Sequence, residues 1–346
     1  MIHAADGNLL EANVEALVNT VNCVGIMGKG IALQFKQAFP ENFTSYAKAC
    51  KTGDVRLGRM FVYPTHSLFN PKFIVNFPTK QHWKSKSKLQ DVRAGLEALI
   101  RVVKKYEIKS IAVPPLGSGL GGLNWPDVKR LILAAFDSLP DVEVHLYEPK
   151  GSPQVDKMPI STAKPKMTKG RALLIKLLEI YRNQGYRHSL LEIQKLMYFM
   201  QVTGEHLRLN YQKNQFGPYA ENLHHVLQHM EGHLIRGYGD RSAQAEIYLL
   251  DGAVDEAQSI IDSDEEAKRR LDAVARLIQG FETPYGMELL ATVHWVAQES
   301  PAAAIDPDLA VQEIQHWSER KKYKMKPQHI KKAWQRLHNE NWLNAA

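Results

Sequence analysis

Two glycine-rich segments in the first half of the chain each follow a β-rich run and precede a helical pattern. The first extends from Asn19 to Ile31, and the second from Pro114 to Gly122. A strand that turns through glycines into a helix presents backbone N–H groups and the positive end of a helix dipole on one side. Glycine permits the positive φ angles and close backbone approach that such loops need. The pair predicts an α/β domain that binds a phosphate-containing ligand.

Further β-rich and helical segments alternate with these loops. The β-rich runs lie at 14–19, 61–63, 73–77, 110–113 and 142–146. Apolar residues at helical spacing lie at 30–39, 91–106 and 126–136. This alternation is typical of a layered α/β domain with a mixed sheet flanked by helices. Open sheets of this kind bind ligands at the carboxyl ends of their strands, so we expect both glycine-rich loops to line one cleft.

The composition changes after residue 149. Residues 151–169 are rich in Pro, Lys, Ser and Thr, which indicates a linker. Helical spacing dominates beyond it, at 173–181, 190–197, 256–281, 286–298 and 327–339, with a short β piece at 245–249. The sequence therefore predicts an α/β domain at 1–150, a linker at 151–169, and a mainly α-helical domain at 170–346.

A third segment, Asn76–Trp83, places a lysine near the same sheet edge. The strand is expected to end at Pro78, so Lys80 lies in the following loop beside aromatic residues. A lysine among apolar and cationic neighbours can have a lowered pKa and act as a nucleophile or base. The alternative is a solvated surface lysine. The two glycine-rich loops are the reason to single out Lys80.

Charge and composition indicate the kind of partner and the cellular location that suit this protein. The 346 residues carry a net charge of +7. Residues 1–170 hold 23 Lys and Arg against 14 Asp and Glu, whereas residues 171–346 hold 21 against 23. A basic first half suits a polyanionic partner, although it also fits a domain that is charged only for solubility. With no signal peptide or membrane-length apolar run, we expect a cytoplasmic protein with no membrane partner and two reduced thiols, Cys23 and Cys50.

The two glycine-rich segments and the segment Asn76–Trp83 together resemble the macrodomain family, which binds ADP-ribose. The resemblance covers residues 1–150. It implies that Asn22 contacts the distal ribose, that both loops wrap the diphosphate, and that Asn8 replaces an acidic residue beside the adenine. The residues implied to bind ADP-ribose are Asn8, Leu9, Asn19, Gly28, Lys29, Gly30, Ile31, Thr79, Pro115, Gly117, Ser118, Gly119, Leu120 and Gly121. ADP-ribose is then ligand or product, and no cofactor is implied.

The run from Phe77 to Trp83 resembles the lysine-dependent branch of this family, which removes terminal ADP-ribose. It is most similar to the antitoxin members that act on thymine-linked ADP-ribose in single-stranded DNA. The resemblance implies that Lys80 and Asn22 are catalytic. Lys80 either attacks the anomeric carbon C1″ or stabilises and protonates the departing base, while Asn22 holds the ribose. Protein-deacylating relatives carry an acid where this chain has Gly121, which favours a base as the leaving group.

The second half resembles Panacea-type antitoxin domains, in the runs 191–199 and 214–223. It implies a domain that binds and neutralises a cognate ADP-ribosyltransferase toxin. The acid-rich stretch 240–266 is either a solvated face or a surface that fills the toxin's cationic groove. His225, His229 and His233 have helical spacing, but no carboxylate or Cys completes a metal site, and none is expected.

These inferences predict an antitoxin glycohydrolase whose partners are ADP-ribosylated single-stranded DNA and the toxin. Two alternatives stay open. One is a protein mono-ADP-ribosyl glycohydrolase, and the other is a reader that binds ADP-ribose without hydrolysing it.

Overall fold

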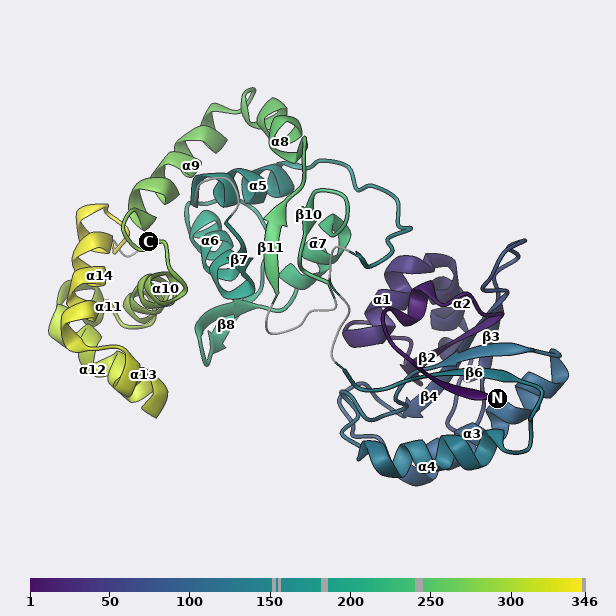
Figure 1. Cartoon of the computed structure of the whole chain (residues 1–346). Coiled ribbons are helices and arrows are strands. Elements are labelled where there is room, and N and C mark those ends of the chain that lie inside the picture. The colour runs from purple at the N-terminus through teal and green to yellow at the C-terminus, as the bar shows by residue number, and fades with distance from the viewer. Residues whose placement is uncertain (151–153, 155–156, 182–185, 240–244, 344–346) are drawn as a thin grey trace. The chain divides into compact units, whose positions relative to one another are not determined.

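The chain is described by a computed structural model that covers residues 1–150, 154, 157–181, 186–239 and 245–343. It divides into two compact units (Figure 1). The first contains Met1–Ala163 and also Gly239, and the second contains the other described residues from Lys164 onward. Each unit is described by itself.

A six-stranded mixed sheet forms the centre of the first unit. Its strands are β1 (Ile2–Ala5), β2 (Ala16–Asn22), β3 (Phe61–Pro64), β4 (Phe73–Lys80), β5 (Ser110–Val113) and β6 (Glu143–Tyr147). They lie in the order β1-β6-β5-β2-β4-β3. All neighbours are parallel except β3, which is antiparallel to β4. The predicted mixed sheet is confirmed.

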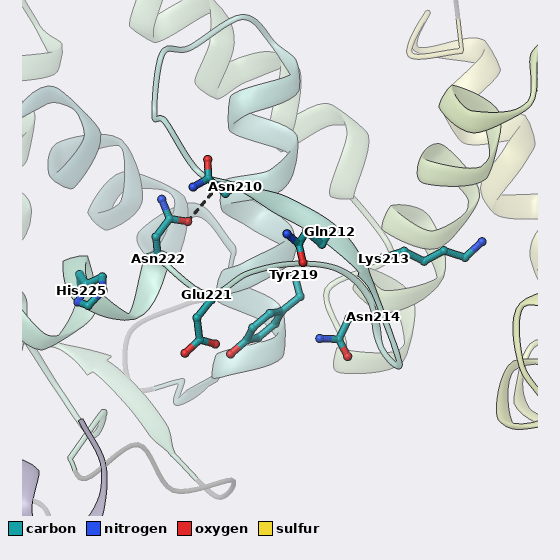
Figure 2. A pocket seen from close by; sticks show the side chains of 8 residues that line it. All are labelled: Asn210, Gln212, Lys213, Asn214, Tyr219, Glu221, Asn222 and His225. Carbon is teal, nitrogen blue, oxygen red and sulfur yellow. Dashed lines mark hydrogen bonds between the residues drawn. The ribbon is translucent and has the colours of Figure 1, made fainter. Parts of the chain in front are cut away.

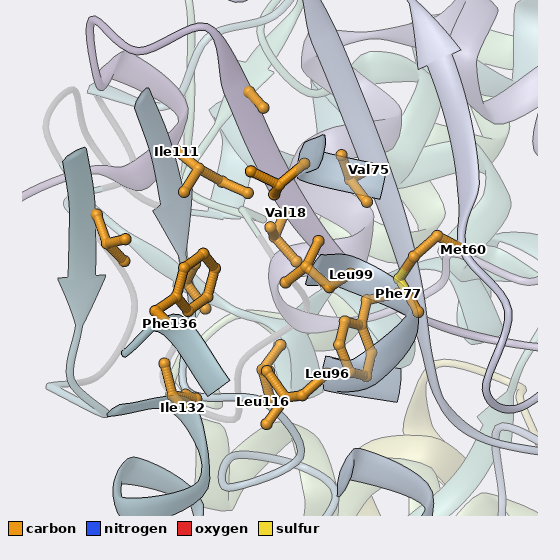
Figure 3. Packing of buried hydrophobic residues seen from close by; sticks show 14 of the residues in the cluster. Val18, Met60, Val75, Phe77, Leu96, Leu99, Ile111, Leu116, Ile132 and Phe136 are labelled. Carbon is orange, nitrogen blue, oxygen red and sulfur yellow. The ribbon is translucent and has the colours of Figure 1, made fainter. Parts of the chain in front are cut away.

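Helices cover both faces of this sheet (Figure 1). The helices α1 (Gly30–Ala38) and α2 (Pro40–Lys51) lie on one face, and α3 (Leu89–Lys105) and α4 (Trp125–Phe136) lie on the other. Successive strand residues point to opposite faces. Val75 and Phe77 therefore join the large core cluster under α3 and α4 (Figure 3), whereas Ile74 packs in the cluster that contains Phe35 of α1.

Strand β4 is longer than the sequence predicted. It does not end at Pro78 but continues to Lys80. In the pairing with β2, Pro78 lies opposite Val21 and Lys80 opposite Asn22, so Thr79 is passed over at a register shift. Proline has no N–H to donate to the neighbouring strand, and strands tolerate it at an irregularity of this kind. Lys80 is thus held by the sheet rather than by a loop.

The second unit is rich in helices, as expected. Its helices are α5 (Lys169–Tyr181), α6 (Leu190–Val202), α7 (Leu223–Met230), α8 (Ala253–Ile261), α9 (Glu265–Ile278), α10 (Pro284–Glu299), α11 (Pro301–Ile305), α12 (Pro307–Trp317), α13 (Glu319–Lys324) and α14 (Pro327–Asn339). Its short strands are β7 (His188–Ser189), β8 (Tyr211–Asn214), β9 (Gly217–Ala220), β10 (Ile235–Arg236) and β11 (Glu246–Leu249). Strands β8 and β9 form a hairpin, and β10, β11 and β7 form a small antiparallel sheet.

The expected helix 256–281 is wrong in one respect, because it is two helices, α8 and α9. Asp264 ends its continuity by accepting a hydrogen bond from the backbone N–H of Ala267 at 2.9 Å. This side-chain cap satisfies a backbone donor at the start of α9. The bounds expected for the two domains and the linker stay a prediction, and 151–153 and 155–156 of that linker lie outside the described residues. None of the described helices is long and apolar enough to cross a membrane.

Candidate active site

The carboxyl ends of β2, β4 and β5 meet at one edge of the sheet, because these neighbours are parallel. Asn22 at the end of β2 lies directly opposite Lys80 at the end of β4. The backbone N–H of Cys23 donates to the carbonyl of Gln81 at 3.1 Å, so the two strand ends stay tied beyond the ladder. The sheet register therefore places the two predicted catalytic residues side by side.

Asn22 organises the first glycine-rich loop. Its Oδ1 accepts hydrogen bonds from the backbone N–H of Val24 at 3.0 Å and of Ile26 at 3.4 Å, and its Nδ2 donates to the carbonyl of Ile26 at 2.5 Å. The hydroxyl of Tyr46, on α2, donates to the carbonyl of Asn22 at 2.6 Å. The Asn22 side chain is only slightly exposed, and one N–H of its amide has no partner among the described residues. The Asn22 amide can therefore donate one further hydrogen bond.

The first loop ends at the N-terminus of α1. Lys29, at the N-cap position, makes no side-chain hydrogen bond to the helix. The first N–H groups of α1 therefore have no cap, which is the arrangement that binds phosphate oxygens. Gly30 has φ of +61°, a conformation that favours glycine. The junction between the first loop and α1 therefore contains Gly28, Lys29, Gly30 and Ile31, and their contact with a phosphate stays a prediction.

The second loop is folded on itself and against the segment that follows Lys80. The N–H of Ser118 donates to the carbonyl of Pro115 at 2.9 Å, and the N–H of Ser87 donates to the carbonyl of Gly121 at 3.1 Å. A Cβ at Gly121 would lie 2.4 Å from both the Gly117 carbonyl oxygen and Ser87 Oγ. Gly121 therefore marks a close approach of backbones that no side chain fits, in addition to lacking the acid of some relatives.

The two glycine-rich loops also meet each other. A Cβ on Gly30 would lie 3.1 Å from Cδ1 of Leu120, so the tip of the second loop covers the start of α1. Gly119 is open, because a Cβ there would have no atom within 4 Å. The hydroxyl oxygens of Ser118 and Ser87 are buried and have no partner among the described residues. The structure thus brings both loops and the residues that follow Lys80 together at one sheet edge.

Lys80 is half-buried at this edge. Burial lowers the pKa of its ammonium group, and the positive charge of Lys86 lowers that pKa further. Within the described residues, Lys80 forms no ion pair that would restore the pKa. A lowered pKa raises the fraction of neutral amine, which is the nucleophilic and basic form.

Four predicted ligand residues lie deeper than expected or are otherwise occupied. Asn19 is 0% exposed and donates to Asn76 Oδ1 at 3.0 Å in a buried amide cluster, while its own Oδ1 is buried without a hydrogen-bond partner among the described residues. Leu9 is a core residue, and buried Thr79 donates to the carbonyl of Val21 at 3.4 Å. Asn8 accepts from the N–H of Leu10 at 3.1 Å, which occupies part of the carbonyl expected to meet adenine.

Sequence reasoning missed two residues that shape the site, Tyr46 and Ser87. Tyr46 is on α2, which was not predicted as a helix, although Pro40 near its start and Glu41 in its first turn are helix-start signals. Ser87 carries no local signal, because its role arises from contact with Gly117 and Gly121, which lie 30 and 34 residues further along the chain.

A separate polar cavity of about 430 Å³ lies in the second unit. Figure 2 shows its lining side chains, which come from the β8–β9 hairpin and the start of α7. They are Asn210, Gln212, Lys213, Asn214, Tyr219, Glu221, Asn222 and His225. The N–H of Asn210 donates to Asn222 Oδ1 at 3.0 Å. Four of these residues, Asn214, Tyr219, Glu221 and Asn222, belong to the 214–223 run that was identified from its resemblance to antitoxin domains.

The other sequence candidates in the second unit have structural partners. Asp264 pairs with Lys169 at 2.8 Å and Glu266 pairs with Arg270 at 2.5 Å, so part of the acid-rich stretch is neutralised within the unit. His229 contacts the backbone carbonyl of His225 through Nδ1 at 2.6 Å. Among the described residues, no group of His, Cys, Asp and Glu side chains is arranged to hold a metal ion.

The chain is similar in sequence and structure to several known proteins. The family model "Macro domain" matches residues 18–132. Proteins named DNA ADP-ribosyl glycohydrolase are 47% identical in Thermus aquaticus, over 93% of this chain and 89% of the relative, and 45% identical in Mycobacterium tuberculosis, over 93% and 94%. The solved macrodomain of Mycobacterium tuberculosis DarG is 58% identical, covers 43% of this chain and 99% of its own, and has a TM-score of 0.43.

Proposed function

Because this chain belongs to the DNA ADP-ribosyl glycohydrolase family, we propose that it removes ADP-ribose from thymine bases of single-stranded DNA, with Lys80 and Asn22 as catalytic residues. The chain is an ADP-ribosyl glycohydrolase with a macrodomain. The observation that carries the proposal is the opposition of Asn22 and Lys80 at the edge where both glycine-rich loops converge.

In the proposed reaction, the bond between C1″ of the terminal ribose and the base nitrogen breaks. Its electron pair leaves with the base, a delocalised anion that then takes up a proton. The neutral amine of Lys80 forms a bond to C1″, the ribose ring opens to an imine, and water hydrolyses the imine to free ADP-ribose and the amine. The lowered pKa of Lys80 supports this role, and the remaining amide N–H of Asn22 orients the ribose.

The first experiment removes the amine. We expect Lys80→Ala to reduce release of ADP-ribose from a modified single-stranded oligonucleotide by about 10²–10⁴-fold, the usual contribution of a positioned catalytic group. Lys72→Ala is the matched control, because Lys72 precedes the other end of β4 and pairs with Glu15 at 2.8 Å on the surface. Full activity of Lys80→Ala on DNA would exclude the proposed role. Activity of the native protein only on ADP-ribosylated protein would redirect the proposal to a protein substrate.

A second experiment tests covalent attack. Borohydride reduces an imine, so treatment during turnover should leave an ADP-ribose-derived adduct on the peptide that contains Lys80. Mass spectrometry of the digested protein locates it. If hydrolysis proceeds normally and no adduct forms, Lys80 acts instead by stabilising and protonating the departing base.

We further propose that the second unit binds and neutralises a cognate DarT-like ADP-ribosyltransferase toxin in the cytoplasm. The runs 191–199 and 214–223 support this, because they resemble antitoxin domains. A further relative, from Thermosipho africanus, is named as a DNA ADP-ribosyl transferase–DNA ADP-ribosyl glycohydrolase fusion protein and is 33% identical over 44% of this chain and 44% of its own length. Its name joins the two activities in one protein.

The two proposed activities separate in the full-length Lys80→Ala protein. We expect this variant to inhibit the toxin's modification of an oligonucleotide in proportion to the amount added, although it releases no ADP-ribose. Absence of inhibition at a large excess would show that protection depends on hydrolysis alone.

A further inference from the structure

The segment that follows Lys80 is strongly basic. Residues 81–88, called here the lysine segment, contain Lys84, Lys86 and Lys88 and no acidic residue. None of the three lysines forms an ion pair with any residue that the structure describes. A run of uncompensated cations beside an active site attracts a polyanion.

An exposed aromatic ring lies within this segment. The side chain of Trp83 is 47% exposed. The His82 ring lies beside it, with centroids 5.4 Å apart and planes inclined by 32°, and Lys84 Nζ lies 5.0 Å from the Trp83 ring centroid. Exposed aromatic rings interleaved with cations are the means by which proteins hold single-stranded nucleic acid, with bases on the rings and phosphates on the cations.

The lysine segment is held in place relative to the site. Its first residue, Gln81, accepts a hydrogen bond from the N–H of Cys23, and near its far end the N–H of Ser87 donates to the carbonyl of Gly121. Between them, the N–H of Ser85 donates to the carbonyl of His82 at 3.0 Å. The segment therefore connects Lys80 to the second glycine-rich loop by a fixed path, which limits the ordering cost of binding a ligand.

We propose that the lysine segment seats the DNA strand that flanks the modified nucleotide. A base next to the modified thymine stacks on Trp83, and the neighbouring phosphates contact Lys84 and Lys88. The inference rests on the proposed function, since it places the DNA beside Lys80.

The test compares two substrates on the full-length protein. One is an ADP-ribosylated single-stranded oligonucleotide, and the other is ADP-ribosylated thymidine, which has no flanking nucleotides. We expect Trp83→Ala to lower kcat/KM for the oligonucleotide by about tenfold or more relative to thymidine, because stacking of one base is worth that much or more. Trp83→Phe retains a ring and should recover most of the loss. Equal losses on both substrates would overturn the proposal.

The lysines are tested through salt dependence. Lys84→Gln/Lys88→Gln should reduce the slope of log affinity against log salt for an unmodified single-stranded oligonucleotide by about 1.4, at roughly 0.7 for each lost phosphate contact. Lys86 is left intact because it also acts on the pKa of Lys80. Lys104→Gln/Lys105→Gln, at the far end of α3, is the matched control and should leave the slope unchanged.

The outcomes separate the two proposals. Suppose that the native protein hydrolyses both substrates, that Trp83→Ala lowers kcat/KM equally on both, and that Lys84→Gln/Lys88→Gln leaves the salt slope unchanged. The lysine segment then does not hold DNA, and the proposed function stands. An unchanged salt slope with weakened toxin binding would instead assign the segment to an acidic protein surface. If the native protein hydrolyses neither substrate, the proposed function itself fails.

Discussion

Lys80 owes its lowered pKa to burial first and to Lys86 second. The second cause is the easier one to change, because a single substitution removes the charge of Lys86. We expect Lys86→Gln to raise the pKa of Lys80 towards its ordinary value. If the neutral amine reacts, the rise of kcat/KM with pH then moves to higher pH.

A pH profile of kcat/KM on ADP-ribosylated thymidine measures this shift without involving a DNA strand. Lys104→Gln serves as the control for loss of a distant charge. A shift of the rising limb to lower pH would contradict the assignment of that limb to the Lys80 amine.

Gly121 offers a second prediction at the scale of one residue. A Cβ there would overlap Ser87 and the Gly117 carbonyl, so Gly121→Ala must displace backbone. We expect a cost of about 1–3 kcal/mol, as for other overpacked positions. Thermal unfolding should show a lower Tm for Gly121→Ala, whereas Gly119→Ala, with nothing within 4 Å, should keep the native Tm. Equal Tm values for the two variants would refute the close-approach explanation.

At the scale of elements, a buried ionic cluster ties α10 to α13. Arg320 donates two hydrogen bonds to the Glu288 carboxylate, at 2.6 and 2.9 Å. Lys321, which is fully buried, donates to Glu288 at 3.0 Å and to Thr292 at 2.9 Å. Burial alone would raise the pKa of Glu288, but Arg320 and Lys321 hold that pKa below its ordinary value. The charges in this cluster depend on one another.

Neutralising the acid should therefore destabilise the second unit. We expect Glu288→Gln to lower the free energy of unfolding by about 3–5 kcal/mol, because it leaves Lys321 buried without its counter-charge. Glu265→Gln is the control, since Glu265 is exposed and its pair with Lys268 is worth less than about 1 kcal/mol. Urea denaturation measures both. Because the pKa of Glu288 is lowered on folding, its contribution is present above the unfolded pKa and is lost as the pH falls through the folded pKa.

At the scale of the whole molecule, the two units differ in charge and in the elements that form them. The basic first unit contains the whole mixed sheet and the candidate active site, and the second unit contains the polar cavity. Each has its own buried core. Units built this way can fold alone.

We accordingly expect residues 1–163 and 164–346, produced as separate proteins, to divide the proposed activities. The first fragment should hydrolyse ADP-ribosylated thymidine at a rate close to that of the full chain, and the second should inhibit the toxin. Circular dichroism and thermal unfolding establish first that each fragment is folded. A folded first fragment without activity would mean that the second unit contributes to the site.

Local patterns in the sequence were sufficient to predict the α/β class, the helical second half, and elements such as β5 at Ser110–Val113 and α14 at Pro327–Asn339. Hydrophobic periodicity and turn residues report the conformation of the residues that carry them. The glycine-rich loops and Lys80 were also identified from local sequence. The continuation of β4 past Pro78 and the break before α9 were not predicted. Pro78 is a local signal for the end of a strand, and apolar residues at helical spacing lie on both sides of the break.

Only the tertiary structure decided which side chains share the site. The opposition of Asn22 and Lys80 depends on the register between two strands that are far apart in the sequence. The burial of Asn19 depends on its contact with Asn76, and the requirement for glycine at 121 depends on Ser87. Sequence patterns specify local conformation, whereas register and close approach arise from long-range packing, which no single segment encodes.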